Sequence, residues 1–205
     1  MIAGEKLKGS NGKEVMLFPL PTLNISQGEG GNYSHAGTLN IDFVGDTTQA
    51  PYYAPCKCQC VYAGGVDNIR AFNSLEPVNL PDGSVDYVCF LFMHDDNPVA
   101  TFGSIFEQGD LIGHTGNAGT STSDHVHMNT ARGHYQVMEQ VPPDNQWQLI
   151  NSSHIYDTCY VNDTTIINGY GYNWKIYQGG IKPLLKNNKF NFILFGYYSK
   201  KKRRW

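Results

Sequence analysis

Turn-forming residues divide this chain of 205 residues into short segments, and this division limits its fold more than any other feature. The sequence contains 22 glycines and 10 prolines, and Asp82-Gly83 is a dipeptide typical of tight hairpins. Aromatic and β-branched residues lie between the turns, and the candidate strands are residues 52–63, 85–93 and 125–130. Residues 136–140 form the best helical window, and it is weak. Short strands that alternate with turns predict a mainly β fold with an antiparallel or barrel-like sheet.

The composition argues against two broad classes of protein. Hydrophobic residues make up 40% of the chain and charged residues 16%, unlike a charge-rich disordered chain. The longest apolar run, residues 190–198, is far shorter than the roughly 20 residues that a membrane-spanning helix needs. Residues 1–13 are polar and lack the apolar core of a secretory signal. We therefore expect neither an integral membrane protein nor a conventionally exported one.

Charge is distributed unevenly along the sequence. Residues 182–205 contain eight Lys or Arg and no Asp or Glu, whereas residues 1–181 contain 7 basic and 18 acidic residues, a balance of −11. This basic tail ends in the cationic run from Lys200 to Arg204, which could attract anionic wall polymers, a phospholipid surface or nucleic acid. A solvated, frayed terminus explains the same pattern equally well. No nucleic-acid-binding motif accompanies the tail.

The five cysteines are expected to be reduced thiols. Their number is odd and no secretory signal precedes them, so a disulfide framework is not expected. Cys56, Cys58 and Cys60 alternate along a candidate strand and would share one of its faces. This spacing differs from that of the usual zinc motifs. We therefore favour packing of these thiols in the core over a metal site.

The character of the sequence changes near Pro142-Pro143. From there to residue 178 the chain is rich in Asn, Tyr and Trp, which indicates an irregular, aromatic-rich extension or a small recognition surface. Packing is the simpler role for these aromatic residues. The predicted organisation is a lead-in hairpin at residues 1–29, a central domain at residues 30–141 and a C-terminal extension at residues 142–205.

Histidines occur at three places that could provide a catalytic site. His35 precedes Asp42, His94 follows the strongest candidate strand, and His125 and His127 form an H-x-H pair. Residues two apart on a strand point to the same side, so His125 and His127 would share one face. With an imidazole or carboxylate from a neighbouring strand, that face could hold a zinc ion and leave one position for water. Zinc lowers the pKa of bound water toward neutrality and so supplies a nucleophile.

The order and context of these motifs resemble the M23 (lysostaphin/LytM-type) family of zinc endopeptidases. That family pairs an early H-x(n)-D motif with a loop rich in Gly, Ser and Thr that leads into H-x-H, as in residues 113–127 here. Residues 52–64 and 106–113 are similar to its strand pair and to a following turn. The resemblance covers residues 30–135 and implies an antiparallel β-sheet core of the M23/LytM type.

Carried over position by position, the resemblance implies that His35, Asp42 and His127 ligate one zinc ion (Zn2+) per chain. It implies that His125 and His94 are the catalytic imidazoles, with His125 acting on the zinc-bound water. Histidine suits these proton transfers because its pKa lies near neutrality.

The spacing from His35 to Asp42 departs from the family's usual H-x-x-x-D, because six residues lie between the two positions. On a regular strand they would face opposite sides, so a bulge or loop near Gly37 must bring them together. Asp46 is the alternative carboxylate ligand. Three other histidines do not match the motif, and structural or surface roles are expected for them: His114, His134 and His154.

The resemblance implies a zinc metallo-endopeptidase that cuts peptide bonds in the stem or cross-bridge of bacterial peptidoglycan. A compact domain without a secretory signal fits a bacteriophage lysin, either an endolysin that passes from the host cytoplasm to the cell wall or a bacteriolytic virion tail enzyme. The expected partners are peptidoglycan, anionic wall polymers on the basic tail and phage tail proteins, with no specific nucleic acid. Two alternatives remain, a catalytically inactive wall-binding domain and a virion tail structural protein. The sequence identifies neither the bond that is cut nor the host nor the oligomeric state.

Overall fold

The computed structural model describes residues 1–178, so the basic tail at residues 182–205 lies outside the described residues. These residues fold mainly into β-strands, and the one α-helix among them is the short α1 (Ile155–Thr158). No helix in this part of the chain is long and apolar enough to cross a membrane. The predicted mainly β class with antiparallel pairing is confirmed.

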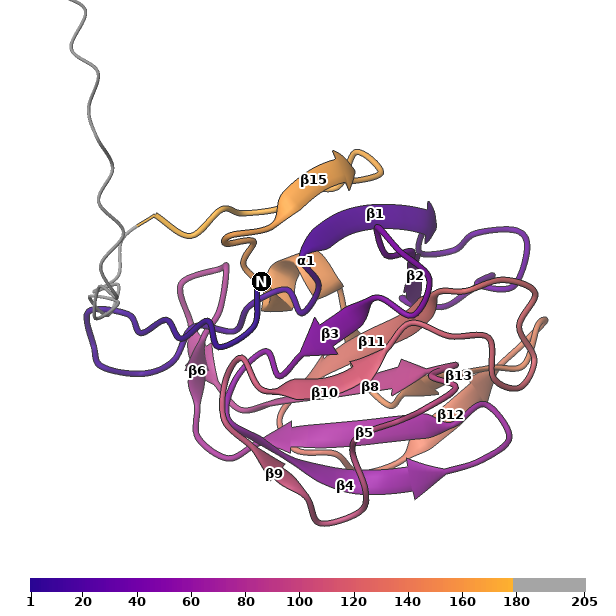
Figure 1. Cartoon of the computed structure of the whole chain (residues 1–205), viewed down its shortest axis with the longest axis horizontal. Helices are drawn as coiled ribbons and strands as arrows, with labels where there is room; N and C mark the ends of the chain where they lie inside the picture. The colour runs from indigo at the N-terminus through magenta and orange to yellow at the C-terminus, as the bar shows by residue number, and fades with distance from the viewer. Residues whose placement is uncertain (179–205) are drawn as a thin grey trace, which may run out of the picture.

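A nine-stranded sheet forms the centre of the molecule (Figure 1). Its strands lie in the order β15 (Thr165–Asn168), β1 (Thr22–Gln27), β2 (Ile41–Phe43), β11 (Val126–Arg132), β8 (Val88–Met93), β5 (Ile69–Ser74), β4 (Cys58–Gly64) and β9 (Ile105–Phe106), and β14 (Ser152–Ser153) also pairs with β11. Its pairings are antiparallel except that of β1 with β15, which is parallel. Three two-stranded sheets accompany it: β3 (Pro51–Tyr53) with β10 (Leu111–His114), β6 (Val78–Asn79) with β7 (Val85–Asp86), and β12 (Met138–Val141) with β13 (Gln146–Leu149).

Strand β8 separates two hydrophobic cores and is buried along its whole length. Phe90 and Phe92 belong to the larger core, and Phe72 of β5 stacks on Phe90 with ring centroids 5.2 Å apart. Leu91 and Met93 belong to the smaller core on the other face. Because alternate side chains of a strand point to opposite faces, a strand covered on both sides appears as a continuous apolar run.

The candidate strands of the sequence correspond to strands of the structure. Residues 52–63 fall in β3 and β4, residues 85–93 in β7 and β8, and residues 125–130 in β11. Gly83 adopts the left-handed conformation (φ +88°) in the predicted turn between β6 and β7. The weak helical prediction at residues 136–140 was wrong, because this segment runs into β12, whose backbone groups pair with β13 in a hairpin.

The cysteines pack in the core, as predicted. Cys56, Cys58 and Cys60 have no exposed surface and belong to the larger core, and Cys89 and Cys159 are also buried as free thiols. The β4 residues sit among aromatic and aliphatic side chains, where a thiol acts as a small hydrophobe.

The C-terminal part of the described chain adds strands to the central sheet. Strand β14 pairs with β11, β15 pairs with β1, and α1 lies against β11. Trp174 packs edge-on against Phe18 in the larger core, with ring centroids 5.5 Å apart. In Figure 1, the orange strand β15 near the end of the described chain therefore lies beside the indigo strand β1 near its beginning.

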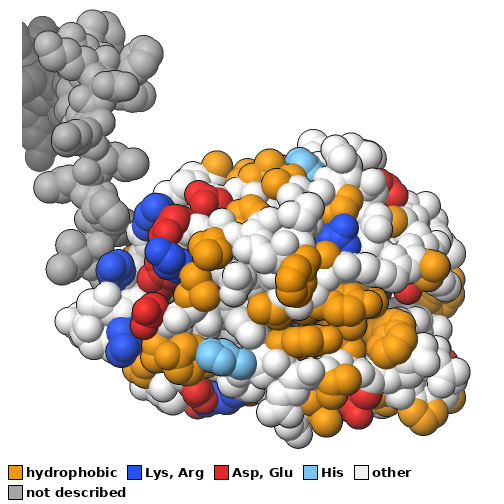
Figure 2. Space-filling view, turned by 90° about the horizontal axis from the view of Figure 1, so that it is seen from below, with side chains coloured by type: hydrophobic (Ala, Val, Ile, Leu, Met, Phe, Trp, Pro, Cys, Tyr) orange, Lys and Arg blue, Asp and Glu red, His pale blue; other side chains and the backbone are white. Residues whose placement is uncertain are grey.

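Charged side chains of both signs gather at one end of the face shown in Figure 2, and hydrophobic side chains cover much of its middle. Lys57 and Glu107 form an exposed ion pair at 2.6 Å, and Arg132 pairs with Asp82 at the same distance. Exposed pairs contribute about 0–1 kcal/mol each. The stability of the fold therefore comes mainly from its buried hydrophobic clusters.

Candidate metal centre

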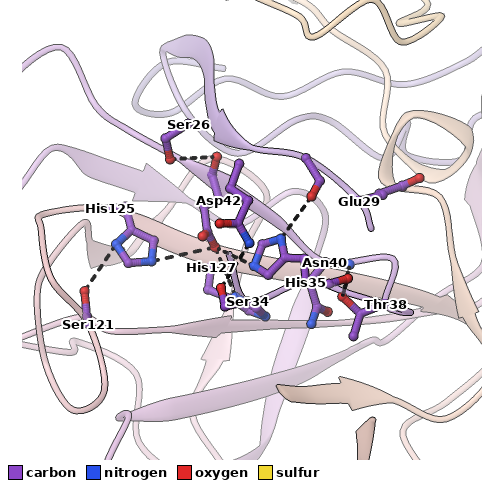
Figure 3. Close-up of polar contacts among 12 residues, drawn as sticks. Ser26, Glu29, Ser34, His35, Thr38, Asn40, Asp42, Ser121, His125 and His127 are labelled. Carbon is purple, nitrogen blue, oxygen red and sulfur yellow. Dashed lines mark hydrogen bonds and ion pairs between the residues drawn. The ribbon is translucent and has the colours of Figure 1, made fainter. Parts of the chain in front are cut away.

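Five residues that the motifs singled out meet at one end of three neighbouring strands, and Figure 3 labels four of them, His35, Asp42, His125 and His127. His35 lies in the turns between β1 and β2, Asp42 lies in β2, and His127 lies in β11. The pairing of β2 with β11 places Asp42 directly opposite His127. His94 follows the last residue of β8, and His125 precedes β11. The strand order β2–β11–β8 therefore brings together side chains that are far apart in the sequence.

Three of these residues place one ligand atom each around a common point. Asp42 Oδ1 lies 3.0 Å from His127 Nδ1 and 3.3 Å from His35 Nε2. The three atoms lie within 4.8 Å of one another, and all three residues are buried. Ligand atoms on a tetrahedral zinc ion at about 2.0–2.2 Å lie roughly 3.4 Å apart. The spacing and the donor set of two imidazoles and one carboxylate therefore fit a zinc ion.

Buried polar atoms without partners support this fit. His35 Nε2 and Asp42 Oδ1 are buried, and neither makes a hydrogen bond of good geometry within residues 1–178. The other ring nitrogen, His35 Nδ1, donates to the backbone oxygen of Gly28 at 3.1 Å. Since a carbonyl oxygen only accepts, Nδ1 carries the hydrogen and Nε2 keeps its lone pair for a ligand.

The pKa values of two ligand residues depart from their ordinary values. Burial lowers the pKa of His127 to about 4 in spite of its contact with Asp42, so this imidazole is neutral at pH 7. Burial by itself would raise the pKa of the Asp42 carboxyl. The polar contacts with His127 and His35 outweigh burial and hold that pKa well below its ordinary value. A neutral imidazole beside a carboxylate is the state that binds a metal.

The structure brings Asp42, and not Asp46, together with the histidines. His35 lies in a loop and not on a strand, and the chain reverses at Gly37, whose φ is +77°. The opposite-face problem of the long spacing therefore does not arise. Asp46 lies beyond the end of β2, where it lines a separate open hollow with Asp124.

His94 and His125 lie beside the three-residue group with their rings 4.8 Å apart. His94 Nδ1 donates to the backbone oxygen of Ala118 at 2.8 Å, and His125 Nδ1 donates to that of Ser123 at 2.8 Å. In both rings the carbonyl partner fixes the hydrogen on Nδ1 and leaves Nε2 as the basic nitrogen. His125 Nε2 lies 3.6 Å from Asp42 Oδ1. Burial lowers the pKa of His94, which favours its neutral form.

An open cleft of about 600 Å³ leads to this group. Asp42, His94, His125 and His127 line it, and polar residues provide most of the remaining wall: Ser26, Gln27, Tyr33, Ser34, Thr120, Ser121, Thr122, Ser123 and Gln146. Four of these nine polar residues come from the segment before His35, four come from the small-residue loop before His125, and the ninth is Gln146. The wall of the cleft therefore offers many hydroxyl and amide groups that can form hydrogen bonds.

The other histidines lie outside the group. His114 ends β10, and its backbone N–H donates to Asp95 at 2.8 Å. His134 packs edge-on against Tyr87, and His154 Nδ1 lies 2.7 Å from Glu29 Oε2.

Sequence reasoning missed the groups that orient the imidazoles. They are the backbone oxygens of Gly28, Ala118 and Ser123. No side-chain pattern encodes a backbone acceptor, so only the folded loops reveal it. Sequence reasoning likewise missed the contact of Glu29 with His154, because 125 positions separate the two residues in the sequence.

The fold and these residues define a β-sheet protein with a buried candidate site for one metal ion and two further imidazoles able to exchange protons. No family model matches the sequence. The chain is 42% identical over 169 residues to "Morphogenesis protein 1" of Bacillus phage B103, in an alignment that covers 82% of this chain and 46% of that protein. The chain thus spans less than half the length of this curated relative.

Several solved structures of peptidases are similar to this chain. One is the catalytic domain of the antimicrobial peptidase lysostaphin from Staphylococcus simulans, with 20% identity, coverage of 58% of this chain and 80% of that chain, and a TM-score of 0.37. Another is the catalytic domain of a mutant of the prophage-encoded M23 protein EnpA from Enterococcus faecalis, with 17% identity, coverage of 58% and 88%, and a TM-score of 0.43. A third is a putative M23 peptidase from Pseudomonas aeruginosa, with 19% identity, coverage of 64% and 49%, and a TM-score of 0.41. The structural neighbours are M23-type peptidases, and the sequence relative is a phage protein.

Proposed function

We propose that this chain is a zinc-dependent endopeptidase of the M23 type that hydrolyses peptide bonds in bacterial peptidoglycan. The observation that carries the proposal is the buried group of His35, Asp42 and His127 at the base of a polar cleft, with His94 and His125 beside it. Two imidazoles and one carboxylate are a common ligand set of hydrolytic zinc sites, which keep one position open.

Each residue has a role that its geometry allows. A zinc ion held by the three ligand residues would lower the pKa of a water molecule and polarise a carbonyl group. His125, whose Nε2 carries the lone pair, accepts the proton of the attacking water and returns it to the leaving amine. His94, with its Nε2 also free, is the second imidazole that interacts with the reacting centre.

A phage would use this activity to degrade the host wall. The relative named as a morphogenesis protein favours a virion-associated enzyme, and release as a free endolysin is the other route. The basic tail would hold the acidic body near anionic wall polymers, because residues 1–181 carry a balance of −11. The alternative is a catalytically inactive domain with the same fold that binds the wall or forms part of the virion tail.

The deciding experiment is a digest of purified peptidoglycan from several wall chemotypes, analysed by mass spectrometry. We expect new free amino groups without new reducing sugar ends, suppression by a chelator and recovery with zinc. The products would identify the bond. A zinc-loaded protein that cleaves no chemotype would favour the inactive wall-binding domain, and detection of the chain in purified particles would place it in the virion.

A further inference from the structure

The turn at Gly28 and Glu29 connects the candidate metal ligand His35 to the C-terminal part of the chain. The oxygen of Gly28 accepts the hydrogen bond that fixes the His35 ring. The next residue, Glu29, donates its backbone N–H to the Tyr172 hydroxyl at 2.9 Å. Its carboxylate accepts a hydrogen bond from His154 Nδ1 at 2.7 Å. The peptide group that orients His35 is therefore held by Tyr172 and His154, which lie 143 and 125 positions after Glu29 in the sequence.

The Glu29 carboxylate is buried at a cost to stability. Its side chain is 9% exposed, and Oε1 has no hydrogen-bond partner in the described part of the chain. Burial raises the pKa of Glu29, although the contacts with His154 and Tyr156 partly oppose this. A buried carboxylate that makes only part of its possible hydrogen bonds is poor for stability, so a role in positioning explains its presence better.

Aromatic stacking fixes the groups that hold the turn. The rings of His154 and Tyr156 are stacked with centroids 4.9 Å apart, and Tyr156 stacks on Tyr172 at the same distance. The rings press so closely on Gly28 that a Cβ there would lie 2.5 Å from the Tyr172 hydroxyl oxygen and 2.6 Å from Tyr170 Cε1. A larger residue at position 28 would therefore displace these two tyrosine side chains.

We propose that Glu29, His154 and Tyr172 are positioning residues for His35, and that the C-terminal segment thereby forms part of the metal centre. They hold the Gly28 carbonyl so that the ring hydrogen of His35 lies on Nδ1 and Nε2 is left to bind a metal ion. The inference rests on the proposed function in one respect, that His35 binds a metal. It assigns a role to a segment that lies outside the resemblance to M23 peptidases.

The test removes these contacts singly and measures metal binding. The variants are Tyr172→Phe, which loses only the hydroxyl, Glu29→Ala, and Glu29→Gln, which keeps an acceptor for His154. Loss of an outer partner of a metal ligand typically costs about 10–100-fold in metal affinity. We expect zinc dissociation constants, measured by competition with a chromophoric chelator, to rise by about 10-fold or more for Tyr172→Phe and Glu29→Ala. Glu29→Gln should recover much of the affinity.

Cobalt spectra and a matched control separate positioning from stability. The visible absorption of the Co²⁺-loaded protein reports ligand geometry, and we expect it to change in Tyr172→Phe and Glu29→Ala. The control is Tyr177→Phe, which removes a phenol hydroxyl from the same segment, where the ring packs against Tyr160. It should bind zinc and cobalt like the unmodified protein. Thermal unfolding of each metal-free variant checks that it is folded.

Unchanged zinc affinity and cobalt spectra in Tyr172→Phe and Glu29→Ala would overturn the inference. If Glu29→Ala does not fold, Tyr172→Phe and Glu29→Gln decide the matter alone. An unmodified protein that binds no zinc would overturn this inference and the proposed function together. An unmodified protein that binds zinc without cleaving any peptidoglycan would remove only the proposed function.

Discussion

At the scale of single residues, the two candidate histidine ligands present different ring nitrogens to the site. His35 uses Nε2, because its Nδ1 is bonded to Gly28. His127 presents Nδ1 to Asp42, and its Nε2 is buried without a hydrogen-bond partner in residues 1–178. A second proton on His127 would be a buried charge, which is why its pKa falls to about 4. The His127 ring can therefore accept a metal at neutral pH without first losing a proton.

The two histidines of the H-x-H motif should respond differently to substitution. His127→Ala removes a ligand, so we expect zinc content near zero by elemental analysis and no activity. His125→Ala should keep most of its zinc but lose about 10²–10⁴-fold in turnover, the usual contribution of a general base. A His125→Ala protein without zinc would show that the ligand assignment is wrong.

The choice of carboxylate can be tested with a matched pair. Asp42→Asn replaces an oxygen that lies 3.0 Å from His127 Nδ1, and zinc binding should weaken by at least about 100-fold, more than for an outer partner. Asp46→Asn changes an acidic residue in the separate hollow and should bind zinc normally. Equal loss in both variants would contradict the assignment of Asp42.

The buried His127 predicts a pH dependence of the stability of the metal-free protein. Its pKa is about 4 in the folded state and about 6.5 when unfolded, so the unfolded state binds more protons between these values. The free energy of unfolding should therefore rise with pH from 4 to 6.5 and then level off, by about 3 kcal/mol for this group. Urea unfolding at pH 4 and pH 7 measures the change. In the His127→Gln variant, the free energy of unfolding should rise by about 3 kcal/mol less over this pH range than in the unmodified protein. An equal rise in the two proteins would contradict the prediction.

At the scale of elements, the sequence indicated where β4, β8 and β11 of the central sheet lie, but not its other strands or how the strands pair. The apolar run at residues 85–93 could be recognised because β8 is buried on both faces. The segment at residues 136–140 could not, because its conformation depends on pairing with β13 and not on its own periodicity. The same limit applies to the site. The H-x-H motif predicted which residues take part, but the loop that brings His35 to Asp42 depends on the turn at Gly37.

Strand β8 should be the element most sensitive to truncation of its side chains. Phe90 is fully buried between Phe72 and the rest of the larger core, so Phe90→Ala should lower the free energy of unfolding by about 3–5 kcal/mol. Val66 is 80% exposed, and Val66→Ala should change it by less than about 0.5 kcal/mol. Urea unfolding of the two variants makes the comparison, and similar losses would argue against the central place of β8.

At the scale of the whole molecule, the two ends of the described chain are joined through the central sheet and its cores. Strand β15 extends the sheet beside β1, and Trp174 packs on Phe18. The contact of Glu29 with His154 spans 125 positions. Such contacts have no local signature in the sequence, so the pairing of β15 with β1 could not be predicted from it.

The burial of all five thiols has a consequence for chemical reactivity. Burial raises the pKa of Cys159 to about 12 and that of Cys89 to about 11, and Cys56 and Cys58 are shifted in the same direction. Thiolate is the reactive form, so the native protein should react very slowly with a disulfide reagent at pH 8. Titration should find five reactive thiols per chain after unfolding. Rapid reaction of one thiol in the native state would indicate that part of the core opens.

The imidazoles at His35, His94 and His125 all depend on main-chain oxygens, those of Gly28, Ala118 and Ser123. Every amino acid carries such an oxygen, so selection need not preserve side-chain identity at Ala118 and Ser123 to preserve these bonds. The side chains at these two positions can thus change while Nδ1 of His94 and of His125 keeps its hydrogen-bond acceptor. Under the proposed function, side chains of the loop between His114 and His125 that face the cleft could therefore change from one substrate to another while the imidazoles beneath them keep their main-chain partners.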